Sequence, residues 1–185
     1  YLVISGIYAG LTNATTQFLE LYNPTTYQIM IASNATSQML NIINCGNGND
    51  VYPRVYSVEG SGAGFPLYIP SQGYFLISTT SPTINGVLPD AVFPNILANQ
   101  NGLAVSNPIK HVNKGGLAVQ DSYGVKMDSV SWNTGSGGAT DCLEGSPVVV
   151  DNGAGGYGSG GIILRKTSPS GYAGTYGSSF DSGNN

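Results

Sequence analysis

The sequence predicts an all-β domain, and among all-β architectures a β-sandwich with long irregular loops. Three observations lead to this prediction. No segment shows a sustained 3.6-residue apolar period with helix caps. Short runs of aliphatic, β-branched and aromatic residues recur along the chain, separated by clusters of Gly, Pro, Asn and Ser. Many short strands with regular turns and no helices are typical of a sandwich.

The strand candidates of the first half follow one another closely. Segment 17–22 alternates, so Glu20 shares one face with Phe18 and Tyr22 while the leucines take the other face. It ends at Asn23-Pro24-Thr25, a turn signal, because proline disfavours α conformation at the residue before it. The remaining candidates in this half are residues 2–8, 27–32, 38–43, 51–58, 65–69 and 74–78.

The second half holds one long connection and the clearest hairpin. Residues 81–100 include three prolines and predict an irregular excursion, whose length favours a packing or binding surface. The hairpin runs from Gly116 to Trp132 around the turn 121–124, where Asp and Gly supply turn chemistry. Further short strand candidates are residues 103–105, 148–150 and 162–164. We predict one domain, residues 1–185, with 168–185 as a Gly/Ser-rich tail.

Charge is scarce in this chain. Charged residues make up 9% of the sequence, against about 25% in ordinary soluble domains, and the net charge is −4. Arg165-Lys166 is the only adjacent basic pair, so no basic stripe for nucleic acid or anionic lipid exists. No apolar run approaches the ~18 residues that span a bilayer. An uncharged polar surface gives little repulsion between copies and so permits close self-packing.

The start of the chain predicts a secreted protein, and an oxidising compartment would allow its two cysteines to pair. The sequence begins at Tyr1 rather than Met, which we interpret as a mature chain at the cell surface or outside the cell, with its signal peptide removed. Cys45 and Cys142 are too far apart for a CxxC motif. In an oxidising compartment they are a candidate disulfide, worth about 4.7 kcal/mol for a loop of roughly 100 residues. Two unrelated buried thiols are the alternative.

Two N-x-Ser/Thr sequons begin at Asn13 and Asn34. Both are candidate glycosylation sites if the chain passes through a glycosylating secretory route.

No arrangement of residues predicts catalysis. His111 is the only histidine and falls in an expected loop, away from any recognisable nucleophile. The GxGxxG match at 153–158 precedes an apolar strand candidate instead of the helix that a dinucleotide site needs. Asp141 and Glu144 are close in sequence, as are Asp121 and Asp128 across the hairpin. Turn capping and solvated strand positions are the favoured interpretation of these carboxylates, ahead of acid–base chemistry. We expect a non-enzyme without a cofactor or metal, and a calcium site built from scattered oxygens stays open.

Five segments occur in a characteristic order along the chain. They are Leu2-Val3-Ile4-Ser5-Gly6-Ile7-Tyr8, Gln17 to Thr25, Ile69 to Ile77, Gly115 to Trp132, and Ile163-Leu164-Arg165-Lys166 followed by Ser179-Phe180-Asp181. Together they resemble the lamin-tail domain family, in its extracellular prokaryotic type. The resemblance implies an immunoglobulin-like β-sandwich and transfers no catalytic residue. The chain departs from the family at Gly6, where an acidic residue is usual, and in longer loops at 34–64 and 81–113.

Two further side chains carry structural predictions. Glu20 matches a recurrent family position; if it is partly buried it needs a partner, and Arg165 or Lys166 is the candidate for a structural ion pair. Trp132, the only tryptophan, is interpreted as a core residue, with an exposed stacking platform as the alternative.

These observations favour an extracellular structural protein that assembles with copies of itself into a surface filament, fibre or layer. The first strand is the candidate for exchange between copies, because an added strand supplies main-chain hydrogen bonds and side-chain pockets. Its residues are Leu2, Val3, Ile4, Ile7 and Tyr8. The alternative is a secreted module that binds carbohydrate or another surface polymer through its 12 tyrosines and long loops.

Overall fold

The computed structural model confirms the all-β prediction. It describes residues 1–8, 17–34, 37–44, 50–52, 64–78, 86–93, 97–98, 104–105, 109, 114–133, 148–149 and 162–165. Within these ranges every regular element is a β-strand. The search of the described residues for a long apolar helix able to cross a membrane finds none.

The strands of the described residues form two large sheets and two small ones. The first large sheet, here the N-terminal sheet, has the order β15 (Ile162–Leu164), β1 (Val3–Tyr8), β2 (Phe18–Tyr22), β8 (Tyr74–Ser78) and β9 (Ala91–Val92). The second, here the hairpin sheet, has the order β14 (Val148–Val149), β13 (Lys126–Asn133), β12 (Lys114–Asp121), β5 (Leu40–Asn44) and β6 (Asp50–Tyr52). The small sheets are β4 (Ser37–Gln38), β3 (Ile29–Asn34) and β7 (Leu67–Ile69), and the pair β10 (Leu97–Ala98) and β11 (Ala104–Val105).

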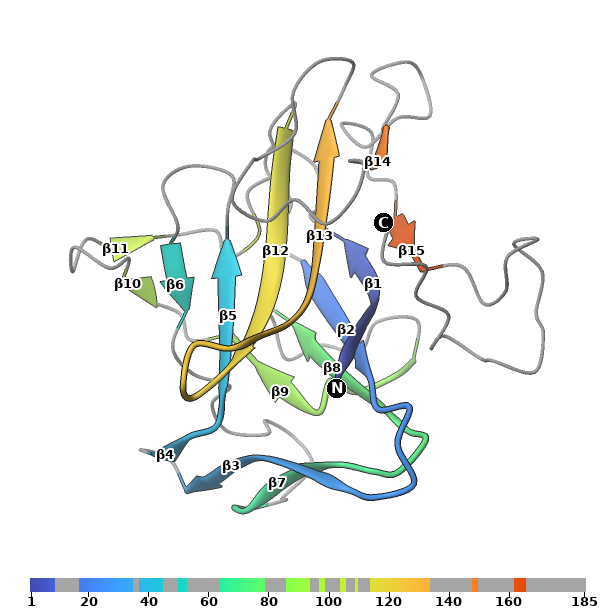
Figure 1. Cartoon of the computed structure of the whole chain (residues 1–185), viewed down its shortest axis with the longest axis vertical. Helices are drawn as coiled ribbons and strands as arrows, with labels where there is room; N and C mark the ends of the chain where they lie inside the picture. Colours follow the sequence, from blue (N-terminus) through green and yellow to red (C-terminus); the bar gives the residue numbers. More distant parts are fainter. Residues whose placement is uncertain are drawn as a thin grey trace.

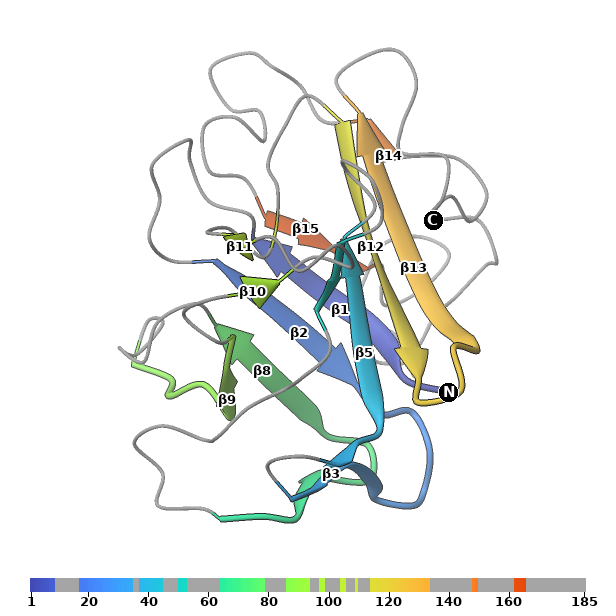
Figure 2. The same ribbon diagram turned by 90° about the vertical axis from the view of Figure 1, so that its left-hand side faces the viewer.

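The two large sheets lie as separate layers. Figures 1 and 2 show β5, β12 and β13 running nearly upright, while β1, β2 and β8 cross them obliquely, with β3 and β7 at one end. One hydrophobic cluster joins both layers, because it includes Leu19 and Leu21 of β2 as well as Leu117 and Val119 of β12. The two sheets therefore share one core. The immunoglobulin-like strand arrangement stays a prediction.

Trp132 is one of the largest side chains in that core and has no exposed surface. This confirms the interpretation of Trp132 as a core residue and removes the alternative of a stacking platform. The residue lies on β13, where it shares the inward face with Val130.

The predicted hairpin is confirmed as β12 and β13. Asp121 Oδ1 accepts hydrogen bonds from the backbone N–H groups of Tyr123 and Val125, at 2.9 and 2.8 Å. Gly124 adopts a φ of 81°, a conformation that side chains other than glycine rarely adopt. The turn chemistry read from the sequence is therefore the chemistry that closes this hairpin.

The predicted irregular excursion at 81–100 contains short strands where the structure describes it. β9 pairs in parallel with β8. Asp90 starts this pairing, because its Oδ2 accepts from the Leu76 N–H at 2.8 Å and its own N–H donates to the Leu76 carbonyl at 2.9 Å. A strand of two residues is too short to show an alternating pattern, so the sequence alone does not predict it.

Candidate functional site

A β-bulge in β1 marks the first part of the candidate site. Its pairing with β2 shifts register between Ile4 and Gly6, so Ser5 is an extra residue in the strand. A bulge interrupts the hydrogen-bond ladder and leaves nearby backbone groups in need of other partners.

Asp128 of β13 supplies one of those partners from the opposite sheet. Its position alternates with Val130 and Trp132, which places it on the inward face of the hairpin sheet. The Ile4 N–H donates to Asp128 Oδ2 at 2.6 Å, and Oδ1 accepts from the Ser129 N–H at 2.9 Å. The carboxylate therefore joins the two layers of the fold.

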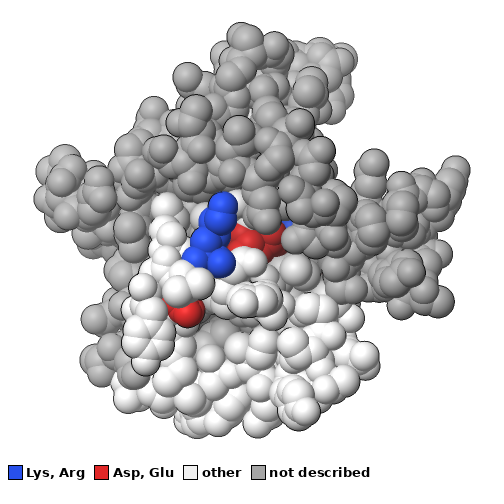
Figure 3. Space-filling view, viewed as in Figure 1, with Lys and Arg blue, Asp and Glu red and all other residues white. Residues whose placement is uncertain are grey.

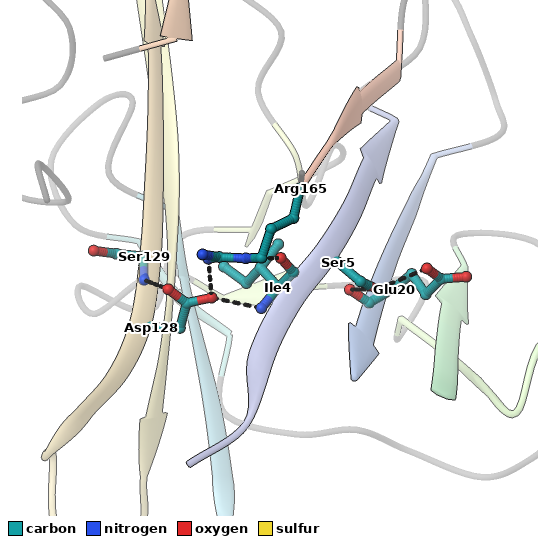
Figure 4. Close-up of polar contacts among 6 residues, drawn as sticks. All are labelled: Ile4, Ser5, Glu20, Asp128, Ser129 and Arg165. Atoms are coloured by element: carbon teal, nitrogen blue, oxygen red, sulfur yellow. Dashed lines mark hydrogen bonds and ion pairs between the residues drawn. The ribbon is translucent and has the colours of Figure 1, made fainter. Parts of the chain in front are cut away.

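Arg165, directly after β15, completes this arrangement (Figure 4). Its Nη2 lies 2.5 Å from Asp128 Oδ2, and its Nε donates to the Ile4 carbonyl at 2.8 Å. Its backbone N–H donates to the Ser5 carbonyl at 2.9 Å. We name the four residues Ile4, Ser5, Asp128 and Arg165 the inter-sheet clasp.

The clasp is almost fully removed from water. The side chains of Arg165 and Asp128 are 6% and 0% exposed. Desolvating two charges is costly, and their attraction offsets this only where further hydrogen bonds satisfy both groups, as the Ile4 and Ser129 backbone contacts do here. Such a buried pair adds little net stability, whereas removal of one partner is costly because the other charge is then buried without compensation.

Glu20 and Arg165, predicted as an ion pair, have other partners in the structure. Glu20 Oε1 accepts from the Ser5 hydroxyl at 2.6 Å, and the Glu20 carbonyl is 3.1 Å from the same hydroxyl. The salt bridge of Arg165 is with Asp128. Lys166, the other candidate cation, lies outside the described residues. The sequence prediction that Asp128 caps a turn or is solvated is wrong, because Asp128 is buried and pairs with Arg165. Its inward place in the alternating hairpin was a usable signal.

The outer face of the N-terminal sheet is the second part of the site. Leu19, Leu21, Phe75 and Ile77 point into the core, so the residues that alternate with them face outward. Two aromatic pairs lie on this outer aromatic face, and their ring centroids are 5.7 Å apart in the first pair and 4.8 Å in the second. The pairs are Tyr8 with Phe18 and Tyr22 with Tyr74.

Two large side chains of this face are open to solvent. Leu164 is 67% exposed and Tyr74 is 47% exposed. Among the side chains that the structure describes on β15, β1, β2, β8 and β9, only Glu20 carries a charge. The face thus combines aromatic and aliphatic groups with a single carboxylate that is already hydrogen-bonded to Ser5.

Asn23 organises the turn region next to Tyr22 and Tyr74. Buried completely, it donates from Nδ2 to the carbonyls of Tyr27 and Pro70, at 2.6 and 2.9 Å. Its Oδ1 accepts from the Thr25 N–H at 3.0 Å. The turn after β2 is thereby tied to the turn before β8, and Tyr27 projects from it with 78% of its surface exposed.

The predicted inter-subunit strand lies inside the N-terminal sheet. β1 is hydrogen-bonded on one edge to β2 and on the other to β15, both of its own chain. Leu2, Val3, Ile4 and Ile7 are buried and Tyr8 is half-buried. Exchange of β1 between copies would reproduce the same pairings with a neighbour's strand, so this role stays a prediction.

Of the two candidate glycosylation sites, the structure describes Asn34. It is exposed at the end of β3, as a glycosylation site requires. Asn13, Cys45, Cys142 and His111 lie outside the described residues, as do residues 168–185.

No family model matches this sequence, and no curated protein matches it. The resemblance to the lamin-tail family therefore stays a prediction that depends on the five sequence segments.

Proposed function

We propose that this chain is an extracellular, non-catalytic structural protein, a subunit whose copies pack into a surface filament, fibre or layer. The observation that carries the proposal is the outer aromatic face, which holds two aromatic pairs and the exposed side chains of Tyr74, a member of one pair, and Leu164. Packing such a face against another protein removes apolar area from water, at about 25 cal/mol per Å². Only one charged group on its described side chains would have to be desolvated.

The scarcity of charge supports the same proposal. In Figure 3 most of the described atoms on the visible side are neither acidic nor basic. Few charges mean little electrostatic repulsion when identical surfaces approach. The clasp also supports the proposal. Because it links the two large sheets, the domain can bind neighbouring copies on opposite sides without rearranging its core.

Tyr74→Lys tests the outer aromatic face. We expect the variant to fold and to lose at least about tenfold in assembly, because each contact would then bury an unpaired ammonium. Tyr123→Lys is the matched control, since Tyr123 is 91% exposed at the hairpin tip, on the other large sheet. Pelleting of assembled protein, followed by quantification of the soluble fraction, measures the effect. Equal assembly of both variants and the unchanged chain would refute a role for this face.

A secreted binding module for carbohydrate or another surface polymer is the second candidate. Exposed Tyr27, held on the turn that Asn23 fixes, favours it, because a rigid exposed aromatic ring is a suitable platform for a sugar face. Retention of monomeric protein on an insoluble polysaccharide, lost in Tyr27→Ala and kept in Tyr123→Ala, would favour this candidate over assembly.

A further inference from the structure

β15 lies at one edge of the N-terminal sheet. Among the described residues it pairs with β1 alone, and the register covers the three pairs Gly6–Leu164, Ile7–Ile163 and Tyr8–Ile162. Of its described side chains, Ile163 packs partly against the core and Leu164 is 67% exposed. The hydrophobic anchoring that these two described side chains give is therefore small.

Arg165 compensates for this weak anchoring. The guanidinium enters a socket formed by Asp128 Oδ2 and the Ile4 carbonyl, and the Arg165 N–H extends the ladder to the Ser5 carbonyl. Figure 4 shows the arginine reaching from the end of β15 across β1 toward β13. The socket itself belongs to β1 and β13, so it exists independently of which molecule supplies the arginine.

Withdrawing β1 from its own sheet would cost far more than withdrawing β15. Withdrawing β1 breaks two ladders and exposes Leu2, Ile4 and Ile7, which are at most 4% exposed. Withdrawing β15 breaks one short ladder and exposes part of Ile163. It also leaves Asp128 buried without its cation, a state that strongly favours refilling by another arginine-bearing strand.

We infer that β15 with Arg165, and not β1, is the segment exchanged between copies of this chain. This inference rests on the proposed assembly function. The partner is a second copy of the chain, whose Ile163-Leu164-Arg165 pairs with β1 and fills the Asp128 socket. Every contact of the closed chain is re-formed, so the exchange itself changes the free energy little. A head-to-tail series of such exchanges builds a filament when the rotation between successive copies does not close it into a ring.

Cysteine pairing between two variants tests which strand crosses. A Cβ built on Gly6 lies 3.2 Å from Leu164 Cδ2 and 3.7 Å from Glu20 Cβ, so Gly6→Cys faces both neighbours. Gly6→Cys is co-expressed with Leu164→Cys in one sample and with Glu20→Cys in another, assembled, oxidised and run on a non-reducing gel. Each single variant alone, and the unchanged chain with its native cysteines, are the controls.

The inference predicts a disulfide-linked dimer for Gly6→Cys with Leu164→Cys and none for Gly6→Cys with Glu20→Cys. Dimers in both samples would identify β1 as the exchanged strand and overturn it. Fibres without either dimer would show that both strands stay in their own chain, which overturns the exchange and leaves assembly intact. Monomers without fibres or dimers would remove the proposed function together with the exchange.

A second measurement does not depend on the cysteine variants folding. A synthetic peptide of residues 161–167 is added while dissociated protein reassembles. We expect it to occupy free β1 edges and stop fibre growth, whereas the same peptide with Arg165→Gln should not. Equal effects of the two peptides would contradict the arginine socket.

Discussion

Asp128→Ala is expected to lower the free energy of unfolding by about 3–5 kcal/mol, a large share of the 5–15 kcal/mol typical of a domain. The variant leaves the Arg165 guanidinium buried without its carboxylate, and the Ile4 N–H loses its acceptor. Urea unfolding followed by Trp132 fluorescence measures the change, because Trp132 is the only tryptophan and lies in the core between the sheets.

Glu20→Gln is the matched control for that experiment. It removes the same charge from a side chain on the outer face whose hydrogen bond from Ser5 the glutamine oxygen can still accept. We expect a loss below about 1 kcal/mol. The double variant Asp128→Leu, Arg165→Met should be more stable than Asp128→Ala, because no charge stays buried. Equal losses for Asp128→Ala and Glu20→Gln would contradict the structural role of the clasp.

Trp132→Ala is expected to cost about 3–5 kcal/mol as well, for a different reason. The substitution opens a cavity between β13 and the core that the surrounding side chains fill only in part. Thermal unfolding followed by circular dichroism measures it, since the fluorescent reporter is gone. Val125→Ala, 54% exposed, serves as the control and should stay within about 0.5 kcal/mol. A loss as small as the control's would mean that Trp132 does not fill the core.

The local elements of this fold were predictable because local chemistry determines them. Alternation in 17–22 places Leu19 and Leu21 in the core, as the structure has them. Asp121 and Gly124 specify the hairpin turn through side-chain acceptance and a positive φ. Burial of Trp132 follows from the same hairpin, whose inward face it shares with Val130.

The candidate site was less predictable because it depends on which strands meet across the core. Asp128 and Ile4 are 124 positions apart, and nothing in either segment alone indicates their contact. β1 lies between β2 and β15 because β15 pairs with its free edge. A run of three apolar residues is too short to predict this pairing from the sequence. Reading Glu20 as the partner of Arg165 relied on sequence likeness, whereas the structure gives the arginine a carboxylate from the facing sheet.

Electron microscopy of the purified chain at neutral pH shows whether copies of the chain assemble. We expect long regular fibres or an ordered layer, with one copy of the chain per repeat. A monodisperse monomer at the concentrations where structural proteins usually assemble would contradict self-assembly. The polysaccharide-binding alternative would then be the function to pursue.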